Sequence, residues 1–196
     1  MARRRQERYH GRMSAFPQDR MSVEDYLAWS EATEGRYELI DGKVVAQAAE
    51  RAAHAEMKGA IYAAFRDEIR RKKLPCRVLP DGMAVRVGKT TVFEPDVQIY
   101  CGPRLGSSAL LSEPMVVVEV LSPSTGRNDA LRKLGPYFSL ASVQHYLIVD
   151  PDEPLVVHHA RGEGETIVTR IHRDGAMTLE PPGIELALAE IYEAQG

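Results

Sequence analysis

The chain has 196 residues and a mass of 21.8 kDa, and its composition of 44% hydrophobic and 27% charged residues is that of a globular domain rather than a disordered segment. No run approaches the roughly 20 apolar residues that cross a bilayer, and the opening MARRRQERYHGRM lacks the apolar core of a secretory signal, so we expect no membrane partner. Because two separated cysteines, Cys76 and Cys101, do not make a disulfide framework, we expect unpaired thiols and a cytoplasmic location.

Charge is distributed unevenly along the chain. Residues 1–20 hold six arginines against Glu7 and Asp19, a balance of +4, so a total of -3 leaves -7 on residues 21–196. This acidic body disfavours tight, sequence-independent DNA binding by the body alone. We interpret residues 1–20 as a disordered basic extension or as a source of DNA contacts, with a start at Met13 or Met21 left open, and residues 21–196 as a single domain.

Two local signals mark the beginning of the predicted domain. Ser22 and Asp25 have the spacing of a capping box, which predicts a short helix after Ser22. The pair Asp41-Gly42 favours positive φ and stands between two apolar runs, which predicts a tight hairpin with Glu38 in its first strand.

The middle of the chain combines one helical pattern with several strand patterns. Apolar residues recur every three or four positions over residues 52–73, and a cationic last turn suits the helix dipole, so we expect a long amphipathic helix. Short apolar runs separated by turn residues then predict strands at 77–79, 83–87, 92–93 and 97–100. We interpret 101–114 as a loop and the β-branched run 115–121 as a central strand covered on both faces.

The C-terminal part predicts one more helix over the sheet and further strands. Residues 128–140 have a helical pattern that Gly135-Pro136 is expected to bend or interrupt. The remaining predicted elements are a buried strand at 145–149, strands at 155–160, 166–171 and 177–179, and a terminal helix at 184–193. The sum is an α/β fold, with a mixed central sheet flanked by helices and additional C-terminal strands.

A resemblance to a known family rests on several motifs in a fixed order. They are YELIDGKVV, His54 at the start of a helix, EPDVQIY, VVVEVLSPST, Asp129 with Lys133, and HYLIVDP. In this order they resemble the Uma-two family of bacterial endonucleases, within the PD-(D/E)XK superfamily of restriction-endonuclease-like folds. The resemblance runs from about Ser22 to the C-terminus. It implies a metal-dependent phosphodiesterase with its site at one edge of the central sheet and nucleic acid, above all DNA, as the partner.

Two acidic residues stand where charge is costly, at the ends of apolar runs. Asp96 precedes one predicted strand and Glu119 lies near the end of another. A buried carboxylate is retained mainly where it is paired or binds a metal. Neighbouring strands lie about 4.8 Å apart, so Asp96 and Glu119 can meet one Mg²⁺ or Mn²⁺ ion, and the carbonyl of Val120 can complete its shell. These residues are our predicted metal ligands.

The catalytic lysine departs from the superfamily motif. That motif places a lysine two residues after the second acid, where this chain has Leu121. The resemblance suggests that the lysine has moved to the next helix, as Lys133, where it orients water or stabilises phosphate charge. Asp129, four residues earlier, shares its helical face as an accessory residue. The alternative is an exposed Asp-Lys pair worth about 0.3 to 0.5 kcal/mol.

Two further residues are candidates for the site. Glu38 would act as a third acid, reaching the metal through water, or else is a solvent-facing strand residue. His54 would contact phosphate or move a proton, or else makes a cap or surface hydrogen bond. His158 and His159 are adjacent on a predicted strand and point to opposite faces, so we do not expect them to chelate one ion together.

Three functions remain open from the sequence. The first is Mg²⁺-dependent cleavage of DNA. The second is a catalytically inactive nuclease-fold module that binds nucleic acid or protein, with a homodimer as one form of it. The acidic body and Leu121 favour this second function. The third keeps the metal but acts on RNA or another phosphodiester.

Overall fold

The computed structural model describes residues 17, 19–107, 110–122 and 126–193. Most of the predicted extension 1–20 lies outside these residues. In chain order the elements are α1 (Val23–Glu31), β1 (Tyr37–Ile40), β2 (Lys43–Ala46), α2 (Ala52–Lys72), β3 (Arg77–Pro80), β4 (Ala84–Arg86), β5 (Val92–Phe93), β6 (Val97–Tyr100), β7 (Leu110–Leu111), β8 (Val116–Val120), α3 (Gly126–Ser139), β9 (His145–Asp150), β10 (Leu155–Arg161), β11 (Ile167–His172), β12 (Ala176–Leu179), β13 (Ile184–Ala187) and α4 (Leu188–Tyr192).

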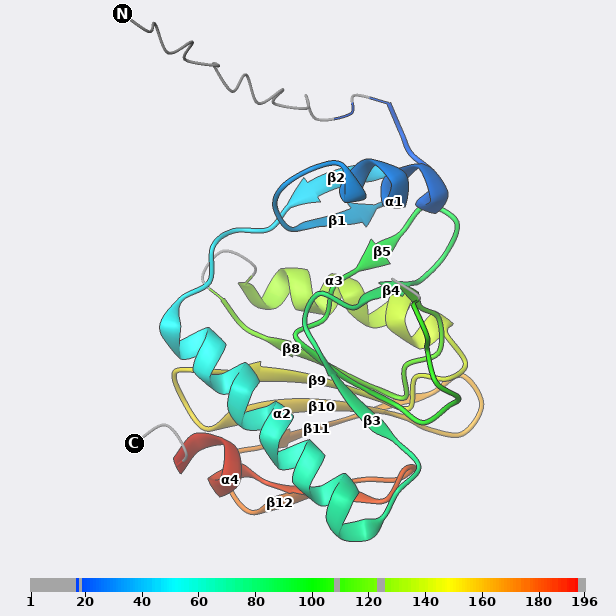
Figure 1. Cartoon of the computed structure of the whole chain (residues 1–196). Helices are drawn as coiled ribbons and strands as arrows, with labels where there is room; N and C mark the ends of the chain where they lie inside the picture. The colour runs from blue at the N-terminus through cyan, green and yellow to red at the C-terminus, as the bar shows by residue number, and fades with distance from the viewer. Residues whose placement is uncertain (1–16, 18, 108–109, 123–125, 194–196) are drawn as a thin grey trace, which may run out of the picture.

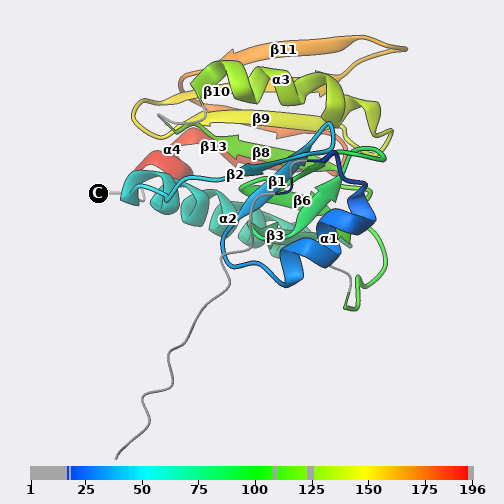
Figure 2. The ribbon, with the colours of Figure 1, turned by 90° about the horizontal axis from the view of Figure 1, so that it is seen from above.

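A six-stranded mixed sheet forms the centre of the molecule (Figure 1). Its strand order is β11-β10-β9-β8-β6-β3, in which β8 and β9 run parallel and the other neighbours run antiparallel. Helix α3 covers one face, while α2 and α4 cover the other (Figure 2). Strand β8 is buried on both faces, as its β-branched sequence predicts. The predicted α/β fold with a mixed sheet is confirmed.

A second sheet, of five strands, carries the N-terminal elements. Its order is β2-β1-β5-β4-β7, and α1 packs beside it through Val23 and Tyr26. The predicted capping box is present, since the Ser22 hydroxyl accepts the Asp25 N–H and the Asp25 carboxylate accepts from the Ser22 backbone. The β1–β2 hairpin turns through Asp41 and Gly42, both with positive φ, as that dipeptide favours. The hairpin places the first strand, and Glu38 in it, above the end of the central sheet.

Several predicted boundaries were wrong. The segment predicted as a terminal helix begins with β13, which pairs with β12, and only Leu188–Tyr192 is helical. The pattern IELALAEIY fits both periods, so pairing with β12 decided the outcome. Helix α3 runs through Pro136 without interruption. Strand β7 was missed, because it is two residues long and depends on β4.

The expectation of unpaired cysteines was also wrong. Cys76 and Cys101 form a disulfide, with their Cα atoms 4.0 Å apart. Arg77 pairs with Tyr100 across β3 and β6, so the two cysteines are the next residues to face each other. This pairing removes the cysteine argument for a reducing compartment, and the cytoplasmic location stays a prediction without that support.

Strands β9 and β10, in the half of the sheet that is farther from β3, carry three buried histidines. His145 Nδ1 lies 2.9 Å from His158 Nε2, and the other ring nitrogen of His145 lies 2.9 Å from the Pro181 carbonyl. Burial, and then the charge of neighbouring His145, lowers the pKa of His158 to about 3. His159 points to the other face and contacts Thr169, as strand alternation predicts. These rings are therefore packed in their neutral form.

We predict that His158 makes the protein acid-sensitive. The unfolded chain takes up a proton on His158 near pH 6.5, whereas the folded chain does so only near pH 3, so stability is lost as the pH falls through this range. In His158→Gln, the slope of the unfolding free energy against pH between 6 and 4 should decrease by about 1.4 kcal/mol per pH unit. Urea unfolding at several pH values measures it, and parallel slopes for both proteins would contradict the prediction.

Candidate functional site

A cleft of about 590 Å³ opens where the β1–β2 hairpin, the start of α2, the end of β8 and the first turns of α3 converge. Ionisable side chains dominate its lining. Six carboxylates and four cationic side chains line it, together with His54: Glu38, Glu50, Glu94, Asp96, Glu119 and Asp129 against Arg36, Arg51, Arg132 and Lys133. With every group ionised, the lining has a formal excess of two negative charges, and every ionisable residue predicted for the site lies in it.

The carboxylate of Asp96 is fixed against the end of β8. Its Oδ2 accepts a hydrogen bond of 2.7 Å from the backbone N–H of Val120, and its own N–H donates to the Val118 carbonyl. Asp96 directly precedes β6, which pairs with β8. Asp96 and Glu119 thus come from neighbouring strands, as the sequence predicts, and the negative charge of Asp96 acts on Glu119.

Lys133 lies between two carboxylates inside the cleft. Its Nζ is 2.8 Å from Glu38 Oε1 and 3.1 Å from Glu119 Oε1. The lysine side chain is almost fully buried, which differs from the exposed Asp-Lys pair that was the alternative. One helical turn later, Tyr137 donates a hydrogen bond of 2.8 Å to Glu119 Oε1. Helix α3 therefore presents an ammonium and a phenol to the same carboxylate.

Burial and neighbouring charges shift the pKa values of Glu119 and Lys133. Desolvation is the largest influence on Glu119 and raises its pKa to about 7, although the charge of Lys133 opposes this effect. Burial alone would lower the pKa of Lys133, but the charges of Glu119 and Glu38 outweigh it and raise that pKa. Glu38 also accepts the Glu94 N–H at 2.9 Å, so it is a buried partner and not a solvent-facing strand residue. Asp129 lines the same cleft one turn before Lys133.

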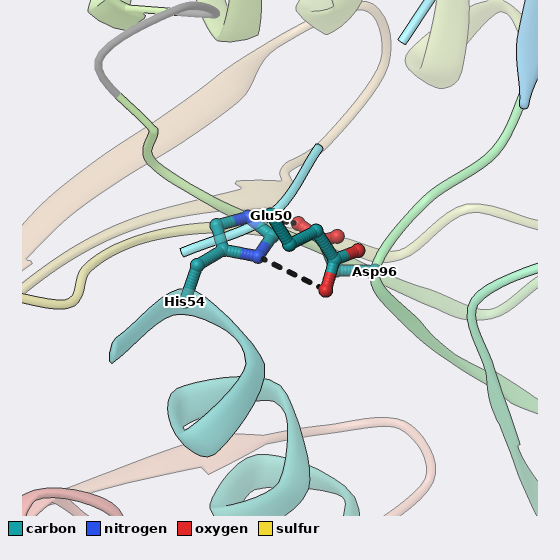
Figure 3. Close-up of side chains that lie close together, drawn as sticks. All are labelled: Glu50, His54 and Asp96. Carbon is teal, nitrogen blue, oxygen red and sulfur yellow. Dashed lines mark ion pairs between the residues drawn. The ribbon is translucent and has the colours of Figure 1, made fainter. Parts of the chain in front are cut away.

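A second cluster, which the sequence analysis did not predict in full, surrounds Asp96. One ligand atom from each of Glu50, His54 and Asp96 lies within 4.8 Å of the other two, and the three side chains point toward one another (Figure 3). His54 Nε2 is 3.0 Å from the Val120 carbonyl and 3.4 Å from Asp96 Oδ2, while His54 Nδ1 is 3.9 Å from Glu50 Oε2. Glu50 was missed, and its only sequence signal is its position four residues before His54 at a helix start.

Protein cations already neutralise part of this cluster. Glu50 Oε1 lies 2.5 Å from both Lys58 Nζ and Arg36 Nη1, and Lys58 also pairs with Asp81 at 2.9 Å. Burial alone would raise the pKa values of Glu50 and Asp81, but hydrogen bonds from these cations outweigh it and lower both. The carboxylates here are consequently held in their ionised form.

The donor atoms fit a divalent cation. Asp96, Glu119 and the Val120 carbonyl supply oxygen atoms, the ligands that Mg²⁺ and Mn²⁺ prefer. Since His54 Nε2 faces a carbonyl, it carries the proton in the neutral ring, and Nδ1 keeps a lone pair. Nδ1 is buried and has no hydrogen-bond partner, so an unused nitrogen donor faces Glu50. Both donor sets share Asp96, and one divalent ion would balance the excess charge of the cleft.

The sequence of residues 23–190 matches the model of the Uma2 family, which is described as "Putative restriction endonuclease". The chain belongs to the Uma2 family. This chain is also similar to an uncharacterized protein of Synechocystis. The two are 26% identical over 186 residues, which cover 93% of this chain and 96% of that protein. Family membership confirms the resemblance on which the predicted site was based.

A solved structure shares the fold of this Uma2 protein. The crystal structure of "a putative nuclease belonging to DUF820" from Anabaena variabilis superposes with a TM-score of 0.71, covering 89% of this chain and 98% of that chain at 15% identity. Identity this low shows the fold alone, which is restriction-endonuclease-like. The family and the fold are thus both those of nuclease-like proteins. Separately, no helix within the described residues has the length and apolar character needed to cross a bilayer.

We predict that the ion pairs of Lys133 stabilise the fold. In Lys133→Met, Glu38 and Glu119 would share a buried site without a cation, which should lower the free energy of unfolding by about 3–5 kcal/mol. The neighbouring change Arg132→Met, at an exposed position, should alter it by no more than about 0.5 kcal/mol. Chemical denaturation measures both values. A loss below about 1 kcal/mol in Lys133→Met would show that the pairs are not needed.

Proposed function

We propose that this protein is an endonuclease that hydrolyses DNA phosphodiester bonds and depends on Mg²⁺ or Mn²⁺. The observation that carries the proposal is the convergence of Asp96, Glu119 and Lys133 from two adjacent strands and the next helix. In the PD-(D/E)XK pattern a lysine follows the second acid by two residues, where Leu121 stands here. Lys133 brings an ammonium to Glu119 from α3 instead, which supports the relocated lysine.

The ion would be held by Asp96, Glu119 and the Val120 carbonyl. When bound, a divalent cation lowers the pKa of water and offsets the charge that a phosphodiester gains during hydrolysis. Asp96 is oriented for this by the Val120 N–H, and Glu119 is oriented by Tyr137. These hydrogen bonds fix the two carboxylates before any ligand arrives, which lowers the cost of binding.

The other residues of the cleft have electrostatic roles in the proposal. Lys133 keeps its positive charge because two carboxylates face it, so it can stabilise phosphate charge or orient a water. Arg51 and Arg132 are exposed on the cleft lining, where they can contact the phosphates of a nucleic acid. Glu38 holds Lys133 in place, and His54 and Asp129 are accessory residues. We further propose a cytoplasmic, homodimeric protein.

Cleavage should fail when Glu119 loses its charge. We expect Glu119→Gln to reduce Mg²⁺-stimulated nicking of plasmid DNA by more than about 100-fold, because even residues that only support a metal ligand are worth 10–100-fold. Glu113→Gln, at an exposed acid just before β8, should keep full activity. Circular dichroism verifies that both variants are folded. Equal cleavage by Glu119→Gln and the unchanged protein would end the proposal, and cleavage of RNA but not DNA would change its substrate.

Metal binding should depend on Asp96 irrespective of cleavage. Asp96 belongs to both donor sets, so Asp96→Asn should abolish the Mn²⁺ binding that calorimetry detects for the unchanged protein. Glu56→Gln, at an exposed position on α2, should bind Mn²⁺ normally. Retained affinity in Asp96→Asn would contradict the ligand assignment. Mn²⁺ binding without cleavage of any nucleic acid would instead favour an inactive nuclease-fold module.

A further inference from the structure

Strand β11 is an exposed edge of the six-stranded sheet. It pairs with β10, and the part of the chain that the structure describes places no strand on its other side (Figure 2). Three of its apolar side chains are exposed to solvent: Ile167 by 38%, Val168 by 40% and Ile171 by 65%. An edge strand of this kind is a template for pairing with another chain.

Most of the usual protections of a sheet edge are missing from β11, whose one charged residue is Arg170. Monomeric proteins guard such edges with charged side chains, above all lysine, and with proline, bulges or very short strands. The opposite edge strand of the same sheet, β3, is four residues long, contains Pro80 and continues from the disulfide at Cys76. Strand β11 has six residues, reads IVTRIH and pairs with β10 in continuous register. Its free edge is therefore open to a partner.

The direction of its free backbone groups follows from one hydrogen bond. The Thr166 carbonyl accepts from the Gly162 N–H at 2.9 Å, so this position faces β10. Main-chain groups alternate in direction along an antiparallel strand. Positions 168, 170 and 172 therefore also face β10, and the N–H and C=O groups of Ile167, Thr169 and Ile171 point outward. Any added strand must bind to these three residues.

We propose that β11 pairs antiparallel with β11 of a second copy of this chain, with the two-fold axis at Thr169. In this register Thr169 faces Thr169 of the second copy, Ile167 faces Ile171, and all three outward residues of both copies form ladder hydrogen bonds. Isologous contacts of this type are the commonest route to a homodimer. The central sheet then continues from one copy into the other.

Charges at the two ends of β11 support the same register. Glu165 precedes the strand and Arg173 follows it, both exposed, and the two-fold axis at Thr169 places each opposite the other across the interface. Opposite charges facing each other stabilise a strand pair, while like charges destabilise it. A shift by two residues in either direction loses one outward residue per copy and sets Ile171 against Glu165 or Ile167 against Arg173.

The exposed apolar surface continues from β11 onto the neighbouring elements. Ile171 stands opposite Val157 of β10, and Val157 lines a small apolar groove with Leu131 of α3, which is itself 50% exposed. A second copy at β11 brings its own isoleucines to this surface. Side-chain burial therefore adds to the backbone hydrogen bonds of the interface.

Sedimentation velocity of the full chain tests the interface. We expect a species of twice 21.8 kDa for the unchanged protein and a monomer for Ile171→Lys. Val45→Lys replaces an exposed apolar residue on β2, another edge strand, and should remain dimeric. A monomeric unchanged protein, or a dimer that Ile171→Lys leaves intact, would overturn the proposal. Glu119→Gln should stay dimeric, which separates this result from the nuclease proposal.

A charge exchange tests the register itself. Each single change, Glu165→Arg or Arg173→Glu, puts like charges opposite each other twice and should weaken dimerisation by about tenfold. The double variant restores opposite charges and should recover the original dissociation constant to within about threefold. Single variants that weaken the dimer without recovery in the double variant would rule out the Thr169 axis. Both positions are exposed, so all three variants should keep the circular dichroism of the unchanged protein.

Discussion

The buried contact of Lys133 with Glu38 and Glu119 is the constraint on which the proposed site depends. It joins the N-terminal hairpin, strand β8 and helix α3, which are far apart in the sequence. Two carboxylates this deeply buried would repel each other without a cation between them, and each would favour its protonated form. The single ammonium bridges the three elements, so the ion pairs that link this end of the sheet also affect the charge of the cleft.

Protein cations neutralise the carboxylates of the acidic cleft unequally. Lys58 and Arg36 neutralise Glu50, and Lys133 serves Glu38 and Glu119. Asp96 has weaker partners, since its closest ionic contact is His54 Nε2 at 3.4 Å and Lys58 is 3.9 Å away. This carboxylate is fixed by a backbone N–H rather than saturated by cations, which is the state expected of a metal ligand.

The sequence predicted those features that follow from local pattern. The apolar and β-branched runs placed Asp96 at the head of one buried strand and Glu119 near the end of another, and the family resemblance identified Lys133, which no local rule would select. Glu50 was not predicted, because its role depends on how the hairpin returns to α2. The Cys76–Cys101 disulfide depends on the β3–β6 register across 25 residues, and such long-range pairing has no local signature.

The most direct test of the central claim is a crystal structure after soaking in Mn²⁺, with anomalous scattering recorded near the manganese edge. We expect an anomalous peak about 2.1 Å from a carboxylate oxygen of Asp96, with Glu119 or the Val120 carbonyl as a further ligand and Lys133 nearby. Saturated crystals with no peak at Asp96, or with manganese bound only elsewhere, would contradict it.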